Sequence, residues 1–239
     1  MTRFKLPILA LTLLALGAAA ALADDLQLGG NYVSVTVDES GVGATQVGGG
    51  PITISYLNGA PLAYVYCVGF FTTINVPGDY TDTGVRNDSD VNGLAVNNAG
   101  AIALLLDQFA MSAAGNLDDE RALQAAIWSL EYNGSGTDFD GSVGANSYHA
   151  TITADIGQNY YNKYLSDMAW LGTETVAEAD AAISTIDWFS PSVHGELNQG
   201  LVGPHTAGAV PEPVSILLFA TLLVLAGTLK RKALGARGQ

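Results

Sequence analysis

Two apolar segments, at residues 6–22 and 214–229, confine a water-soluble fold to the chain between them. The first ends in Ala21-Leu22-Ala23, a small-x-small pattern that signal peptidase cleaves in exported proteins. We therefore expect residues 1–23 to be a signal peptide, the alternative being an uncleaved membrane anchor. About 185 residues remain, enough for one ordinary domain with its own core.

The second apolar segment lies between Val210-Pro211-Glu212-Pro213 and the basic cluster Lys230-Arg231-Lys232. It is a little short for a membrane span unless the basic residues at its end reach up to the interface. Its positive flank should stay in the cytoplasm, which places residues 24–209 outside. A glycolipid-anchor signal would instead end in apolar residues.

The order of Pro211-Glu212-Pro213, apolar helix and basic cluster resembles the PEP-CTERM sorting signal of Gram-negative bacteria. The resemblance implies an exosortase-type processing enzyme as a partner and delivery to the cell surface or an exopolysaccharide matrix. Anchoring in the inner membrane through residues 214–229 would then be transient. We assign residues 210–239 to this signal, with a plain single-span anchor as the alternative.

The charge of the region between the two signals excludes one class of partner. Six of the nine basic residues lie in the terminal segments, which leaves Arg86, Arg121 and Lys163 against nearly all of the 23 acids. Residues 24–209 therefore carry a net charge of about −20. Such a surface repels nucleic acid and anionic lipid.

Hydrophobic alternation predicts a β-rich first third of this domain. Residues 31–37 and 52–56 read as strands, and Gly48-Gly49-Gly50-Pro51 is expected to break the chain between them. Asn58-Gly59 is a strong hairpin signal and leads into a third predicted strand at 61–71, which contains Cys67.

Helical patterns follow after a polar, turn-rich stretch at residues 77–98. One helix is predicted over 99–114, and a second begins at Asp118-Asp119-Glu120, where acids favour a helix start. Gln124 lies beside the apolar stripe of this second helix, which predicts a half-buried side chain.

The last part of the domain mixes both patterns. Residues 148–156 alternate weakly as a strand, 158–185 are partly helical, and 186–189 and 195–202 could be closing strands. The predicted fold class is therefore α+β, a β-rich barrel or sandwich with a helical part inserted between the cysteine strand and the glutamine helix.

Cys67 is the only cysteine of the chain and has no partner for an internal disulfide after export. It is therefore either a buried, inert thiol or a chemically unusual one. Strand geometry places it on one face with Val65 and Gly69, small neighbours that leave room for another element to approach the sulfur.

The segments Tyr66-Cys67 and Gln124-Ala125-Ala126-Ile127-Trp128 together resemble the paired motifs of bacterial thioester domains. In that family a cysteine on an early strand and a glutamine on a helix form an internal thioester. The resemblance implies a Cys67–Gln124 cross-link, with Tyr66, Phe70 and Trp128 keeping water out of its pocket. It further implies an adhesin that captures amine- or hydroxyl-bearing ligands covalently, neither an enzyme nor dependent on a cofactor. Position 123 is Leu where the family often has Thr.

Other readings of the same residues remain open. The first is a non-reactive structural protein of an exopolysaccharide or biofilm matrix, in which Cys67 is inert. His149 could polarise an incoming nucleophile, ahead of His194 and His205. A Cys67–His149 hydrolase is the enzymatic rival, but no nucleophile-elbow signature supports it.

A metal site is not expected. Asp88-Ser89-Asp90-Val91-Asn92-Gly93 imitates the opening of an EF-hand calcium loop. The twelfth position of that loop would be Ala99 instead of glutamate, so the ligand set is incomplete.

The sorting signal makes a prediction about the mature protein. If Pro211-Glu212-Pro213 directs cleavage, the surface form should end near these residues and lack 230–239. Mass spectrometry of C-terminal peptides from the surface fraction measures this directly. Recovery of the 230–239 peptide on the surface form would favour a simple membrane anchor.

Overall fold

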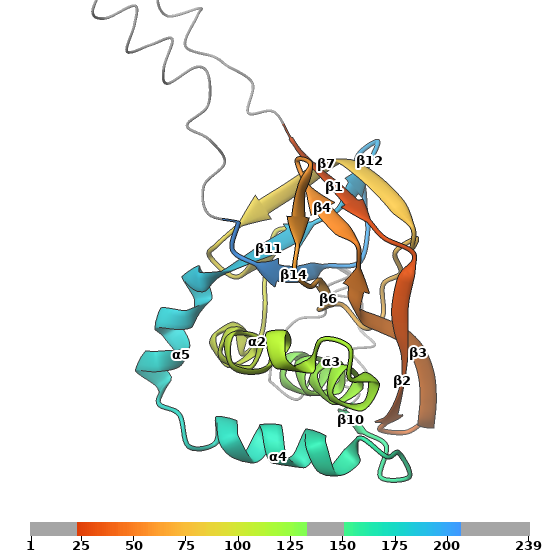
Figure 1. Cartoon of the computed structure of the whole chain (residues 1–239), viewed down its shortest axis with the longest axis vertical. Coiled ribbons are helices and arrows are strands. Elements are labelled where there is room, and N and C mark those ends of the chain that lie inside the picture. The colour runs from red at the N-terminus through yellow and green to blue at the C-terminus, as the bar shows by residue number, and fades with distance from the viewer. Residues whose placement is uncertain (1–22, 133–150, 207–239) are drawn as a thin grey trace, which may run out of the picture. The chain divides into compact units, whose positions relative to one another are not determined.

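The computed structural model describes residues 23–132 and 151–206, which form an α+β fold (Figure 1). A seven-stranded antiparallel sheet curls into a half-barrel, and three strands form a second sheet. A helix lies between the cysteine strand and the glutamine helix along the chain. The predicted fold class is thus confirmed. The predicted signal peptide (residues 1–23), apart from its last residue, and the predicted sorting signal (residues 210–239) lie outside the described residues.

The seven-stranded sheet carries Cys67 on an edge strand. Its order is β5-β4-β1-β7-β11-β14-β6, and β6 pairs with β14 so that Cys67 lies opposite Leu201. The strands are β1 (Asp24–Leu28), β4 (Ser55–Leu57), β5 (Ala60–Leu62), β6 (Tyr66–Cys67), β7 (Gly78–Arg86), β11 (Ile186–Ser190) and β14 (Leu201–Pro204).

The second sheet is built on a long hairpin of β2 (Asn31–Glu39) and β3 (Gly43–Thr53), with β10 (Ile152–Ala154) beside β2. The alternation predicted for β2 is present, because its three inward-facing valines are buried. The predicted break at 48–51 is wrong. Strand β3 continues through this glycine-rich segment, where the missing side chains allow close approach of other backbone.

The Asn58-Gly59 hairpin is confirmed: it joins β4 to β5, and both residues have the positive φ values, 52° and 77°, that such a turn requires. The predicted strand at 61–71 is wrong in extent, because only β5 and the two-residue β6 pair as strands. Every residue from 64 to 68 is buried, so the segment packs on both faces.

The predicted turn-rich stretch at 77–98 contains a nine-residue strand, β7, followed by the small hairpin β8 (Asp90–Val91) and β9 (Leu94–Ala95). The predicted strand at 195–202 is also interrupted. It divides into β13 (Glu196–Leu197), which pairs with β12 (Ser192–Val193), and β14.

Four α-helices are described: α2 (Ala99–Ala113), α3 (Leu117–Tyr132), α4 (Tyr161–Leu171) and α5 (Val176–Ala182), the last followed by the 3-10 turn η1 (Ile183–Thr185). Helices α2 and α3 lie between the strands and the outer helices α4 and α5 (Figure 1). Helix α3 begins as predicted. Three acids occupy its first turn, and Asn116 accepts a hydrogen bond from the Asp118 N–H at 3.3 Å.

The C-terminal end of the described domain is tied to the sheet by Asp187 on β11. This buried carboxylate accepts hydrogen bonds from the Thr206 backbone and hydroxyl, both at 2.9 Å, and pairs with His205 Nδ1 at 2.7 Å.

None of the helices within 23–132 and 151–206 is long and apolar enough to cross a bilayer.

A close contact between α2 and α5 yields a test of the helix packing. A methyl group at Gly100 would lie 2.5 Å from the Ala179 carbonyl oxygen, whereas one at Gly172, after α4, would reach its nearest neighbour at 3.4 Å. Gly100→Ala should therefore lower the free energy of unfolding by about 1–3 kcal/mol. The matched Gly172→Ala should be neutral or slightly stabilising, since its φ is −64°. Denaturant unfolding compares the two, and equal midpoints would contradict the packing.

Candidate functional site

The side chain of Gln124 joins α3 to two strands. Its Oε1 accepts hydrogen bonds from the Gly50 N–H at 2.6 Å and the Cys67 N–H at 3.0 Å, and its Nε2 donates to the Cys67 carbonyl at 2.7 Å. The side chain is fully buried, so the predicted half-burial is wrong. Helix α3 is covered by α2, α4 and strands of both sheets, which leaves this face no solvent.

Cys67 is held on the opposite side by β14. Its strand pairs with β14, and the next residue, Val68, donates its N–H to the Gly200 carbonyl at 2.8 Å. The thiol is almost fully buried, and burial raises its pKa to about 12, although a hydrogen bond from the Gly50 backbone offsets part of the rise. A free thiol at this position therefore stays protonated at neutral pH.

The site is positioned by two glycines of the segment that was predicted to break the chain between two strands. A Cβ at Gly49 would lie 2.6 Å from Gln124 Cγ, and one at Gly50 would lie 2.6 Å from Tyr66 Cα. Only glycine lets β3 come this close to both the glutamine and the cysteine strand. In the sequence, three consecutive glycines inside an otherwise strand-like segment were the signal that could have indicated this close approach.

The predicted aromatic residues surround the pair in different ways. Tyr66 and Trp128 are buried in the core, and Trp128 lies next to Gly49. The ring of Phe70 stacks edge-on against Trp128 with centroids 5.1 Å apart, and its N–H donates to the Tyr132 hydroxyl at 2.8 Å. Of these three residues, Phe70 is the one that lines the pocket next to Cys67.

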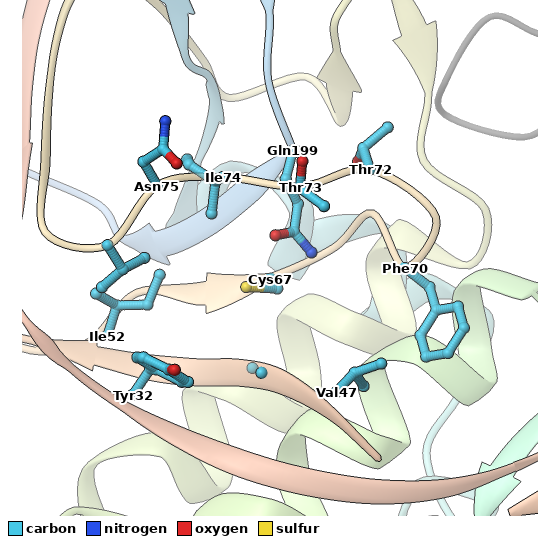
Figure 2. A pocket seen from close by; sticks show the side chains of 13 residues that line it. Tyr32, Val47, Ile52, Cys67, Phe70, Thr72, Thr73, Ile74, Asn75 and Gln199 are labelled. Atoms are coloured by element: carbon cyan, nitrogen blue, oxygen red, sulfur yellow. The ribbon is translucent and has the colours of Figure 1, made fainter. Parts of the chain in front are cut away.

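A pocket of about 430 Å³ opens in front of Cys67 (Figure 2). It lies between β3 and the segment that follows Phe70, residues 72–76, and the Cys67 sulfur and the Gln199 amide face the same hollow. Gln199 is itself fixed, because its Nε2 donates to the Gly69 carbonyl. Ligand pockets in proteins commonly have this size.

The predicted histidines lie elsewhere or are not described. His149 lies outside the described residues, His194 is exposed at the β12–β13 turn, and His205 is paired with Asp187. In the calcium-like loop, Asp88 is engaged by Arg86 in an ion pair. No group of metal-ligating side chains occurs within residues 23–132 and 151–206.

The printed contacts of the Gln124 amide are with the Cys67 backbone, and they bear on an attack of the Cys67 sulfur on the Gln124 side-chain carbonyl. Such an attack moves negative charge onto Oε1, and two backbone N–H groups already donate to that atom. Donors at these distances stabilise an oxyanion. The leaving nitrogen, Nε2, is held against the Cys67 carbonyl. The same three bonds also satisfy buried backbone groups, a structural role that needs no reaction.

Comparisons with known proteins found no family model, curated protein or solved structure that matches the chain.

The hydrogen bonds of Gln124 predict a pH-dependent effect of one substitution. In a Cys67→Ala background, where no covalent bond can contribute, Gln124→Glu would place a carboxylate oxygen against the Cys67 carbonyl. The free energy of unfolding should fall by about 1–3 kcal/mol at neutral pH. Burial raises the pKa of such a carboxyl, so stability should return as the pH is lowered and the group becomes a donor.

Gln46→Glu is the matched control, because Gln46 is exposed on β3. Urea unfolding of both variants between about pH 4 and pH 8, the range in which buried carboxyls titrate, measures how the stability of each depends on pH. Identical pH profiles would show that the Gln124 amide nitrogen makes no important contact.

Proposed function

We propose that this protein is an exported, surface-displayed adhesin or matrix protein that captures its ligand through a Cys67–Gln124 internal thioester. The ligand would carry amine or hydroxyl groups. One observation carries the proposal: the Gln124 carboxamide is buried against Cys67, and its carbonyl oxygen accepts two backbone N–H groups. This arrangement agrees with the paired motifs that resemble thioester domains.

The proposed bond forms without a cofactor. The Cys67 sulfur bonds to Cδ of Gln124, the Cδ–Nε2 bond breaks, and ammonia leaves with the thiol proton. A nucleophile from the pocket later attacks Cδ, forms an amide or ester with the glutamine side chain and releases the Cys67 thiol. This second step consumes the thioester, so each molecule reacts once and is not an enzyme.

The surroundings of the pair support a protected acyl group. Phe70 and Trp128 pack edge to face next to it and would limit the access of water from that side. Lys163 is the only lysine in residues 24–209, and it is occupied in an ion pair with buried Asp167 while its Nζ lies 4.4 Å from the Phe109 ring centroid. Reaction of the protein with its own amines is thereby limited.

The terminal signals set where this chemistry would act. Export through residues 1–23 and sorting through Pro211-Glu212-Pro213 would place the domain at the cell surface or in the matrix of a Gram-negative bacterium. An exosortase-type enzyme would be the processing partner.

The second candidate is a non-reactive matrix protein. The hydrogen bonds of Gln124 are compatible with it, because they also satisfy the buried N–H groups of Gly50 and Cys67 without any reaction. The pocket argues for the reactive protein, since a purely structural cysteine has no need of an open cavity beside its sulfur.

Intact mass separates the two candidates. The purified 24–209 domain should weigh less than its sequence by one ammonia, whereas Cys67→Ala and Gln124→Ala should each have their unmodified sequence masses. The Gln46→Ala variant, altered on the exposed face of β3, should keep the deficit. A wild-type domain at full sequence mass would leave the non-reactive matrix protein as the answer.

Reaction with methylamine tests single use. We expect one adduct, located on Gln124 by fragmentation and missing in Cys67→Ala. The freed thiol should be alkylated in denaturant but slowly in the folded protein, because burial holds the pKa of Cys67 near 12. Repeated turnover of an ester substrate at Cys67 would point to a hydrolase instead.

A further inference from the structure

The pocket in front of Cys67 has an unusual chemistry for this protein. None of the described residues that line it is charged, although the domain that contains it carries nearly all of the chain's 23 acids. Its polar groups are instead neutral: the hydroxyls of Thr72, Thr73 and Tyr32 and the amides of Asn75 and Gln199. Hydroxyl and amide side chains can each donate and accept hydrogen bonds.

The geometry points to a neutral carbohydrate as the occupant: we propose that this pocket binds one sugar unit of a glycan beside Cys67. Sugar binding itself does not require the thioester. Covalent capture of the bound sugar does, and in that respect the inference rests on the proposed function.

Gln199 supplies a fixed polar contact. The residue is 5% exposed, its Nε2 donates to the Gly69 carbonyl, and its backbone N–H donates to the Thr73 carbonyl at 3.2 Å. Within the described residues no donor reaches its Oε1, and the amide faces the hollow next to the Cys67 sulfur (Figure 2). An unpaired amide oxygen that faces a pocket can accept a hydrogen bond from a ligand hydroxyl.

Tyr32 supplies an apolar surface on the opposite wall. Its side chain is 55% exposed, and its ring lies against the backbone of Gly48, where a Cβ would approach the ring to 3.0 Å. One face of the ring thus packs against Gly48, and the other face is exposed to solvent. An aromatic ring with a polar tip suits the face of a sugar, which presents C–H groups with hydroxyls at its edge.

Charged ligands fit this pocket poorly. A protonated amine would enter without a carboxylate to pair with it, and a uronic acid would enter without a cation, each at a desolvation cost of several kcal/mol. The acidic surface of the domain adds repulsion against anionic ligands. A hydroxyl-rich neutral ligand avoids both costs.

Capture of a sugar hydroxyl would be balanced within the site. The hydroxyl oxygen bonds to Cδ of Gln124, the Cδ–Sγ bond breaks, and the hydroxyl proton passes to the departing Cys67 thiolate. The described residues that line the pocket include no histidine or carboxylate, and the departing thiolate can itself accept this proton. The high pKa of this thiol, about 12, makes it an effective acceptor.

The binding test uses the full 24–209 domain with Cys67→Ala, which cannot form a thioester. Ligand-observed NMR with neutral oligosaccharides of glucose, galactose and mannose should detect binding of at least one. Tyr32→Ala should weaken that binding by about ten-fold, the effect of losing one aromatic contact. Tyr56→Ala, altered on β4 outside the pocket, should leave the affinity unchanged.

A second set of probes tests the ligand class. Oligosaccharides of hexuronic acids and a lysine-containing peptide should bind at least ten times more weakly, on the order of 1.4 kcal/mol or more. Binding of the peptide or the acidic sugars in preference to every neutral sugar would overturn the proposal, as would equal losses in Tyr32→Ala and Tyr56→Ala.

The wild-type domain then links binding to capture. After incubation with the sugar that binds, an adduct on Gln124 should be released by mild hydroxylamine, because it is an ester. An ammonia deficit without sugar binding would refute the carbohydrate and leave the thioester standing. Sugar binding by a domain that shows no ammonia deficit would support the carbohydrate site and refute the thioester.

Discussion

The carboxamide of Gln124 makes the hydrogen bonds to the edge strand β6 that a further strand of the sheet would otherwise make. Strand β6 is the edge of its sheet, and Cys67 both donates to and accepts from this one side-chain amide, as it would from the peptide group of a neighbouring strand. The Gly50 N–H of the second sheet binds the same oxygen. One buried amide thus fixes α3, β3 and β6 relative to one another. Leaving these backbone groups unpaired would cost about 1–3 kcal/mol each.

Local patterns were sufficient for the elements whose side chains alternate between core and solvent. The valines of β2, the Asn58-Gly59 turn and the acid-rich start of α3 are all set by neighbours in sequence. Patterns failed where burial is complete. Around Cys67 both faces of the chain are covered, so no alternation marks the strand, and Gln124 is enclosed although its sequence position suggests a half-exposed face.

Candidate site residues could be named from the sequence, but their supports could not. Cys67 and Gln124 came from motif resemblance, and in the structure the Gln124 side-chain amide is hydrogen-bonded to the Cys67 backbone. The role of Gly49 and Gly50 depends on how closely three separate elements approach, which spacing along the chain does not encode. Gln199 was missed for the same reason: it is far from Cys67 in sequence, and the β14–β6 pairing brings it near.

The pairing of β14 with β6 also has a mechanical meaning. His205 and Thr206, the last described residues, are fastened to β11 by the buried carboxylate of Asp187. A pull on the C-terminal end would therefore load β14 along its length. From β14 the force passes sideways through the Leu201–Cys67 pair to the edge strand. A ligand bonded to Gln124 would pull on α3, which packs against β6, so a load between that ligand and a C-terminal tether would cross from β14 through β6 to α3.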